Sequence, residues 1–304
     1  MGISYLAARM MWDARQRGVH FDRVLTLGHQ SLRLFPSEVD FFRTAYRQEF
    51  GSTGADPLGG HRWDDYVDEF LRQFLGAQTV NVLDVSDFEQ ADLIHDMNAP
   101  VPESWHGQYD VVIDGGSLEH IFNVPTAFAN LANMLAVGGS IFVNTPANNM
   151  MGHGFYQFSP ELMYRIFSEE NGFAIRDVML YEARYPGLEL TKKHTVFKVV
   201  DPGVARQRVG LLNKKPVMMM VEAVKVRDTE MFATTPQQSD YVAMWNGDGG
   251  GATTLPWRDR AKQAIRGLPV AVRAPIQGRH QKRVFSLNNK TFYTRERWLP
   301  RDVR

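Results

Sequence analysis

The chain has 304 residues, of which 44% are apolar and 22% charged, so it can bury a substantial core as one α/β domain with extensions or as two small domains. It contains no cysteine, which excludes disulfides, thiolate metal sites and cysteine nucleophiles. The formal net charge is zero, but residues 258–304 hold thirteen Lys/Arg and three Asp/Glu, a net charge of +10.

This basic C-terminal segment could attract nucleic acid, a phosphate-bearing substrate or anionic lipid. Alternatively it folds across the acidic remainder of its own chain. We favour the second interpretation, because uneven charge alone is weak evidence for a partner. Nucleic acid is therefore not an expected partner, and salt-dependent binding of RNA or DNA by this segment is kept as a minor hypothesis.

The first twenty residues are predicted to contain a helix, because Leu6, Met10, Met11 and Ala14 share one helical face. This segment has no continuous apolar run, so it is neither a signal peptide nor a membrane span. No later segment offers about 18 uninterrupted apolar residues. We therefore expect a protein without a transmembrane segment, located in the cytoplasm.

Five short apolar runs are predicted to be buried strands, and helical patterns lie between most of them. In chain order the strands are Arg23–Leu27, Thr79–Asp84, Ala91–His95, Tyr109–Ile113 and Ser140–Asn144. The helical patterns are Pro36–Phe50, Trp63–Leu75, a stretch that begins at Pro125, and a stretch capped by Ser159. Strands that alternate with helices indicate a parallel sheet with helices on both faces.

After Gly172 the pattern changes to two further strands, Phe173–Glu182 and Val217–Val226, with no clear long helix between them. An antiparallel pair formed by these strands would complete a seven-stranded, mostly parallel, Rossmann-like sheet. The predicted organisation is an N-terminal helix in residues 1–20, an α/β domain in residues 21–228, and a basic C-terminal extension in residues 229–304.

One long motif carries a family resemblance. Residues 109–146 read YDVVIDGGSLEHIFNVPTAFANLANMLAVGGSIFVNTP, and residues 152–162 read GHGFYQFSPEL. Both segments resemble class I S-adenosylmethionine (SAM)-dependent methyltransferases, and the resemblance extends over Arg23–Arg227. It implies a Rossmann-like fold, SAM as the cofactor, and methyl transfer as the activity.

Ligands of open parallel sheets bind beyond the carboxyl ends of the strands, where the strand order reverses. The loops that follow the predicted strands are therefore the expected cofactor site. By the resemblance, Asp84 would bind the ribose hydroxyls, and Asp96 and Met97 would flank the adenine. The expected cofactor-binding residues are Gly28, His29, Gln30, Asp84, Asp96, Met97, Asp114 and Gly115.

Two features depart from the family pattern. Gln30 stands where the family places a second glycine, and a side chain there would crowd a close approach of the cofactor. Either Gln30 hydrogen-bonds the cofactor, or SAM binds weakly or not at all. In addition, only Val85–Gln90 separates Asp84 from the next strand, which is too short for the usual helix and predicts an open adenine pocket.

The candidate catalytic residues are His120, His153 and Tyr156. A histidine can accept the proton of a hydroxyl acceptor at neutral pH, which favours O-methylation of a small molecule or a glycan. Alternatively, both histidines are structural residues with backbone hydrogen bonds. The chain would then be a non-catalytic methyltransferase-fold protein that binds a glycan, a nucleotide or a protein partner.

We expect no bound metal, because Asp114, Glu119 and His120 match no strong metal-binding template. The phosphate-binding loop of kinases and the nucleophile elbow of α/β-hydrolases are both absent from the sequence. An Asn-Pro-Pro-Tyr element is also absent after the fourth strand, which argues against methylation of DNA bases. The sequence leaves a homo-oligomer open.

Overall fold

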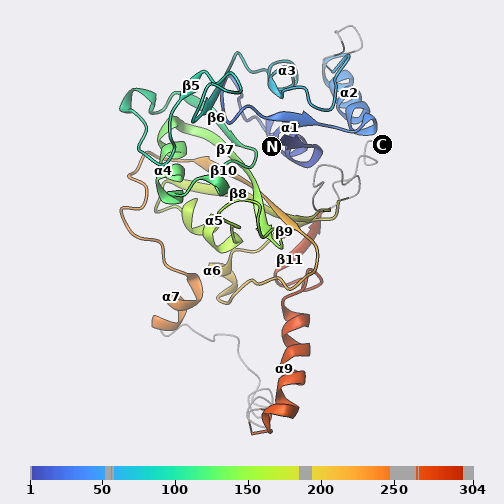
Figure 1. Ribbon diagram of the computed structural model, residues 1–304, viewed down its shortest axis with the longest axis vertical. Helices are drawn as coiled ribbons and strands as arrows, with labels where there is room; N and C mark the ends of the chain where they lie inside the picture. Colours follow the sequence, from blue (N-terminus) through green and yellow to red (C-terminus); the bar gives the residue numbers. More distant parts are fainter. Residues whose placement is uncertain are drawn as a thin grey trace.

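The computed structural model describes residues 2–51, 56, 58–184, 194–246, 265 and 267–296. In these residues the strands form one nine-stranded sheet and one two-stranded sheet (Figure 1). No helix in the described ranges is long and apolar enough to cross a membrane.

Five parallel strands form one half of the large sheet. In spatial order they are β5 (Leu93–Ile94), β4 (Thr79–Asp84), β2 (Arg23–Leu27), β6 (Tyr109–Asp114) and β7 (Leu135–Asn148). Along the chain this is the order 3-2-1-4-5 of nucleotide-binding α/β folds, with its switch point between β2 and β6. The strand order confirms the expected methyltransferase-like α/β fold.

The other half of the sheet is antiparallel and larger than predicted. It contains β10 (Val217–Lys225) between β7 and β8 (Phe173–Glu182), and then β9 (Val196–Val199) and β11 (Tyr293–Glu296). The prediction of seven strands is therefore wrong, because β9 and β11 extend the sheet. β11 comes from the basic C-terminal extension, and its short sequence YTRE has too few apolar residues to be recognised as a strand.

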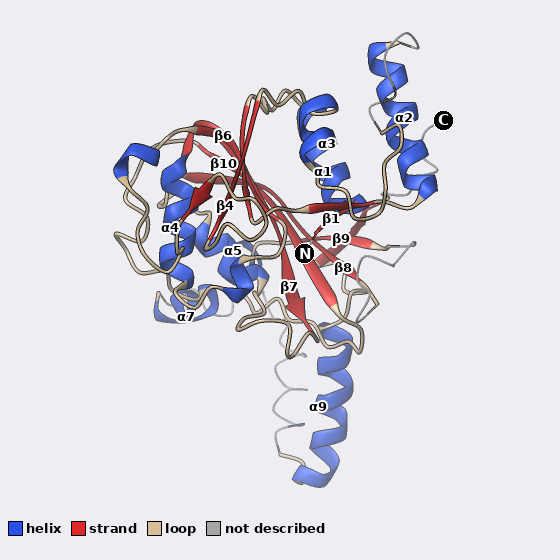
Figure 2. Ribbon diagram, turned by 45° about the horizontal axis from the view of Figure 1, so that its top comes forward, coloured by secondary structure: helices blue, strands red, loops and turns tan. Residues whose placement is uncertain are grey.

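Helices cover both faces of the sheet, as predicted, and each face has its own core (Figure 2). On one side lie α1 (Tyr5–Gln16), α2 (Pro36–Phe50) and α3 (Asp68–Gln73); on the other lie α4 (Val124–Met134) and α5 (Pro160–Ile166). Residues that alternate along β6 divide between the cores, since Val111 and Ile113 belong to the first and Val112 to the second.

The predicted helix boundaries are confirmed in some places and wrong in others. Helix α2 spans the predicted range, and the hydroxyl of Ser159 accepts a hydrogen bond from the Leu162 backbone N–H at 3.2 Å, which caps α5 as expected. The predicted helix Trp63–Leu75 is wrong in its first half. There the backbone instead pairs with the first residue of the short strand β3 (Ser31–Arg33), through a bridge between Ser31 and Tyr66.

The described residues of the C-terminal part include three further helices. They are α6 (Pro202–Ala205), α7 (Ser239–Trp245) and α9 (Val270–Val284). Helix α9 extends away from the sheet (Figure 1), and none of its described side chains is buried. Short 3₁₀ turns, η1 (Glu103–Trp105) and η2 (Leu118–His120), precede and follow β6.

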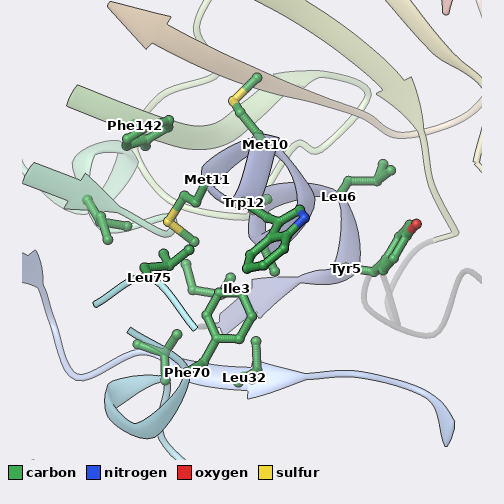
Figure 3. Packing of buried hydrophobic residues seen from close by; sticks show 14 of the residues in the cluster. Ile3, Tyr5, Leu6, Met10, Met11, Trp12, Leu32, Phe70, Leu75 and Phe142 are labelled. Carbon is green, nitrogen blue, oxygen red and sulfur yellow. The ribbon is translucent and has the colours of Figure 1, made fainter. Parts of the chain in front are cut away.

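The N-terminal helix is part of the first core. Eight of the twelve residues of α1 are buried, and Figure 3 shows the helix between Phe142 of β7 on one side and Leu32 and Phe70 on the other. The preceding strand β1 (Gly2–Ser4) pairs in parallel with β3 (Ser31–Arg33), which follows the loop after β2. The N-terminal segment therefore covers the loop in which the cofactor was expected to bind.

An ion pair attaches the end of α1 to the sheet. Arg17 donates two hydrogen bonds, of 2.7 and 2.5 Å, to the carboxylate of Glu222 on β10. Glu222 is only 2% exposed, and burial raises the pKa of its carboxyl, whereas the Arg17 guanidinium opposes that rise. Loss of Arg17 would leave a buried carboxylate without its cation.

We predict that Arg17→Ala lowers the free energy of unfolding by roughly 2–3 kcal/mol at pH 8. The loss should be smaller at pH 5, because the unopposed burial then raises the pKa of Glu222 further and the carboxyl is more often neutral. Urea unfolding at both pH values measures the difference. The double variant Arg17→Ala/Glu222→Gln is the control. A loss that is the same at both pH values, or undiminished in the double variant, would contradict the role of the buried charge.

Candidate functional site

The switch point of the sheet brings four polar or small residues together. Gly28 follows β2 with a positive φ of 74°, and its N–H donates to the Leu83 carbonyl at 2.8 Å. A Cβ added to Gly28 would lie 3.2 Å from Gln30 Nε2, 3.3 Å from Ser117 Oγ and 3.7 Å from Asp84 Oδ2. Ser117, which sequence analysis did not single out, is thus a fourth residue of this site.

Asp84 ends β4 and stays half-exposed. Its Oδ1 accepts a hydrogen bond from the Val85 N–H at 2.6 Å, whereas its Oδ2 is the oxygen that lies toward Gly28. All residues from Val85 to Gln90 are exposed and none is helical, so the predicted short connection is confirmed. The carboxylate is accessible from the solvent side, as a ribose-binding residue must be.

The two residues expected at the adenine have different environments. Asp96 is exposed and accepts hydrogen bonds from the backbone and side-chain nitrogens of Asn98, at 2.9 and 2.7 Å, which lower the pKa of its carboxyl. Met97 is 4% exposed and belongs to the second core, where its carbonyl lies 3.4 Å from Asn130 Nδ2. Asp96 is therefore accessible to a ligand, and Met97 is a core residue.

His29 links the loop after β4 to the start of helix α3. Its Nδ1 lies 2.8 Å from the Glu89 carbonyl and its Nε2 lies 3.0 Å from Asp68 Oδ2. The imidazole also stacks on Tyr66, with ring centroids 3.4 Å apart. Because both ring nitrogens have protein partners, this geometry gives His29 a structural role. A cavity of about 400 Å³ lies beside it, within the long insertion between β2 and β4.

The side chain of Gln30 occupies the space above Gly115. It is 2% exposed, and its Nε2 donates to the Leu27 carbonyl at 2.5 Å. A Cβ added to Gly115 would overlap with Gln30 Oε1 and would lie 3.1 Å from Ile3 Cδ1. Gln30 Oε1 is buried and has no hydrogen-bond partner among the described residues. Gln30 and Ile3 together fill the position where a second glycine would leave room for a ligand.

Asp114 organises the turn after β6. Its Oδ1 accepts hydrogen bonds from the backbone N–H groups of Ser117 and Leu118, at 2.8 and 3.3 Å. Burial, followed by the nearby carboxylate of Glu119, raises the pKa of Asp114 to about 8. The turn carries η2, so Asp114 acts on the site by positioning Glu119 and His120.

Glu119, His120 and His153 form a second cluster at the same edge of the sheet. Glu119 is fully buried, its Oε2 accepts a hydrogen bond from Thr145 Oγ at 3.1 Å, and its Oε1 lies 3.6 Å from His153 Nε2. The rings of His120 and His153 have centroids 5.5 Å apart. The two predicted catalytic histidines are therefore brought together, and Glu119 lies between them and the interior.

The loop after β7 is held against η2 by its backbone. The N–H groups of Phe155 and Tyr156 donate to the Glu119 carbonyl at 2.8 and 3.2 Å. Gly154 has a φ of 112°, and a Cβ there would lie 2.8 Å from the same carbonyl. The Tyr156 hydroxyl donates to the Phe122 carbonyl at 2.9 Å, so the phenol has a backbone partner in this loop.

No family model matches the chain, and no curated protein matches it. Solved structures with similar folds include the YcgJ protein of Bacillus subtilis, at 10% identity and TM-score 0.40, covering 73% of this chain and 99% of that chain. Another is the 1,6-didemethyltoxoflavin-N1-methyltransferase of Burkholderia thailandensis with S-adenosylhomocysteine bound, at 12% identity and TM-score 0.36, covering 73% and 79%. A third is a SAM-dependent methyltransferase of Aquifex aeolicus, at 9% identity and TM-score 0.32, covering 71% and 92%. Likenesses this distant carry no conclusion about the activity of this chain.

We predict that Gly115→Ala destabilises the protein by about 1–3 kcal/mol, because the new methyl group overlaps the Gln30 amide. Gln30→Ala removes that amide, so the double variant Gly115→Ala/Gln30→Ala should recover much of the loss. Thermal unfolding of the four proteins measures the coupling energy. Additive losses would show that Gln30 does not occupy this space in solution.

Proposed function

We propose that the protein is a SAM-dependent methyltransferase that modifies an oxygen of a small molecule or a glycan. The observation that carries the proposal is the convergence of Gly28, Asp84 and Ser117 at the switch point of the sheet. A cluster with two imidazoles lies at the neighbouring strand ends. A nucleoside site beside proton-accepting groups is the arrangement that transfer to a hydroxyl needs.

The residues fit the nucleoside half of SAM. The half-exposed carboxylate of Asp84 can accept hydrogen bonds from both ribose hydroxyls, and the exposed segment Val85–Gln90 leaves room for the base. The methionine half does not fit in this conformation, because Gln30 and Ile3 fill the space above Gly115. We therefore infer that binding requires the Gln30 side chain to rotate out of this space.

SAM supplies a methyl group on a positively charged sulfur, and the residues of the chain position the acceptor for in-line attack. In the metal-free protein, His153 or His120 would accept the proton of the acceptor hydroxyl. Glu119 lies 3.6 Å from His153 Nε2 and would orient its imidazole and stabilise the protonated form. Tyr156, which donates to a backbone carbonyl, would shape the acceptor pocket.

A second candidate function is favoured by the same Gln30 geometry. In a non-catalytic methyltransferase-fold protein the filled space above Gly115 would be permanent. The chain would then bind a glycan, a nucleotide or a protein partner. The two candidates differ in whether removal of the Gln30 amide creates a cofactor site.

We predict that the wild-type protein binds S-adenosylhomocysteine and that Gln30→Ala binds it roughly 10-fold more tightly, because no side chain then has to be displaced. Asp84→Asn should weaken binding by roughly 10- to 100-fold through loss of charge-assisted hydrogen bonds. Isothermal titration calorimetry measures all three. Asp92→Asn, which changes another carboxylate near β5, is the matched control and should bind as wild type.

Absence of binding at millimolar concentration in both the wild type and Gln30→Ala would reject the methyltransferase proposal and favour the second candidate. Binding that Asp84→Asn leaves unchanged would reject the assignment of Asp84 to the ribose.

Once the methyl acceptor is identified, we predict that His153→Asn lowers kcat by roughly 100- to 10,000-fold, which is the usual contribution of a positioned general base. The affinity for S-adenosylhomocysteine should stay unchanged, because His153 is not part of the nucleoside site. Steady-state kinetics and calorimetry on the same preparations separate the two effects. His20→Asn, at an exposed histidine before β2, serves as the control and should keep the wild-type kcat. An unchanged kcat in His153→Asn would contradict the general-base role and leave His153 with a structural role.

A further inference from the structure

We propose that Glu119, His120 and His153 bind one divalent transition-metal cation. The three side chains each offer one donor atom, and these atoms all lie within 4.8 Å of one another. They come from two separate segments, the turn η2 and the loop after β7. The backbone bonds from Phe155 and Tyr156 to the Glu119 carbonyl hold these segments together.

The spacing of the donors suits a cation with a small adjustment. A metal about 2.0–2.2 Å from each nitrogen or oxygen places neighbouring donors roughly 3–3.5 Å apart. Glu119 Oε1 and His153 Nε2 are 3.6 Å apart already. His120 is exposed at the surface of the cluster, so its imidazole can turn toward the other two donors without displacing core residues.

A buried carboxylate oxygen that lacks a hydrogen bond within the described part of the chain is a second observation in favour of a cation. Glu119 is 0% exposed, and its Oε1 has no hydrogen-bond partner among the described residues, although Thr145 satisfies Oε2. A buried carboxylate normally pairs with a cation or a full set of donors, because burial of an uncompensated charge costs several kcal/mol. A cation at Glu119 Oε1 would compensate this buried carboxylate.

The donor types select the class of metal. Two imidazole nitrogens and one carboxylate oxygen suit zinc, manganese, iron or cobalt, whereas magnesium and calcium prefer oxygen ligands throughout. Three protein ligands also leave at least one coordination position open. That position would accept an oxygen ligand, such as water or a substrate hydroxyl.

This inference differs from the expectation of no metal that the sequence supports. His153 is 33 residues beyond His120, so no short spacing template identifies the set. Only the docking of the loop after β7 on η2 brings the three donors together.

The proposed metal ligands include the two histidines that the proposed function uses as proton acceptors. Metal binding by these residues does not, however, require that the protein binds SAM. With a cation bound, both imidazoles are ligands and no longer accept a proton. The acidity of a coordinated hydroxyl would then come from the cation, which lowers the pKa of bound oxygen ligands. Metal binding would thus replace the general-base role of the histidines at the same position.

Cobalt(II) titration of the chelator-treated full-length protein tests the proposal, because cobalt with nitrogen ligands absorbs visible light. We expect saturation at one equivalent and displacement by zinc, with no effect of millimolar magnesium. Glu119→Gln and His153→Asn should each weaken the affinity by roughly 100-fold. His20→Asn should match the wild type. Bound zinc should also raise the melting temperature of the wild type and not of the two variants.

Failure to saturate near one equivalent, or equal affinity in wild type and both variants, would overturn the proposal. Circular dichroism establishes that each variant is folded, and His153→Asn, in a half-exposed loop, keeps the test valid if Glu119→Gln does not fold. Calorimetry with S-adenosylhomocysteine on the same samples tests the proposed function independently of the metal site. Metal binding without cofactor binding would reject the methyltransferase function and leave the metal site supported.

Discussion

The parallel pairing of β2 with both β4 and β6 is the constraint on which the candidate site depends. Leu27 pairs with Leu83 on one side and with Asp114 on the other, so three strands end at the same level. Gly28, Asp84 and the turn after Asp114 must therefore meet, whatever their separation along the chain. The chain after β2 continues to helices on one face of the sheet, and the chain after β6 continues to α4 on the other face. The two loops therefore diverge and leave an edge at which a ligand can bind.

Two buried acidic side chains, Asp114 and Glu119, lie beneath this edge of the sheet. A carboxyl oxygen of Asp114 accepts hydrogen bonds from backbone N–H groups of the following turn, and that turn places Glu119 in the interior. Native proteins seldom keep two acids so close together and so deeply buried without a functional reason. Through His153, 3.6 Å away, the buried carboxyl of Glu119 can influence a bound molecule, by way of a proton or a cation.

The sequence predicts the parts of this molecule that depend on regular periodicity. The parallel strands, helix α2, the cap at Ser159 and the meeting of His120 with His153 all follow from local pattern and strand order. Other features depend on contacts between distant segments. Ile3 lies beside Gln30 above Gly115 because β1 pairs with β3. The backbone at Tyr66 is not helical because it forms a bridge with Ser31. The burial of Glu119 does not follow from the sequence, because a single acid in a Leu-Glu-His turn has no pattern that reveals it.

The position of β10 has a consequence for the order in which the chain is made. This strand lies between β7 and β8, and its Glu222 binds an arginine that is 205 residues earlier in the chain. At translation rates of about 5–20 residues per second, the end of α1 would wait roughly 10–40 seconds for its partner. During synthesis the end of α1 is thus without its ion-pair partner. The buried face of α1 can thus pack on the parallel strands before this ion pair is available.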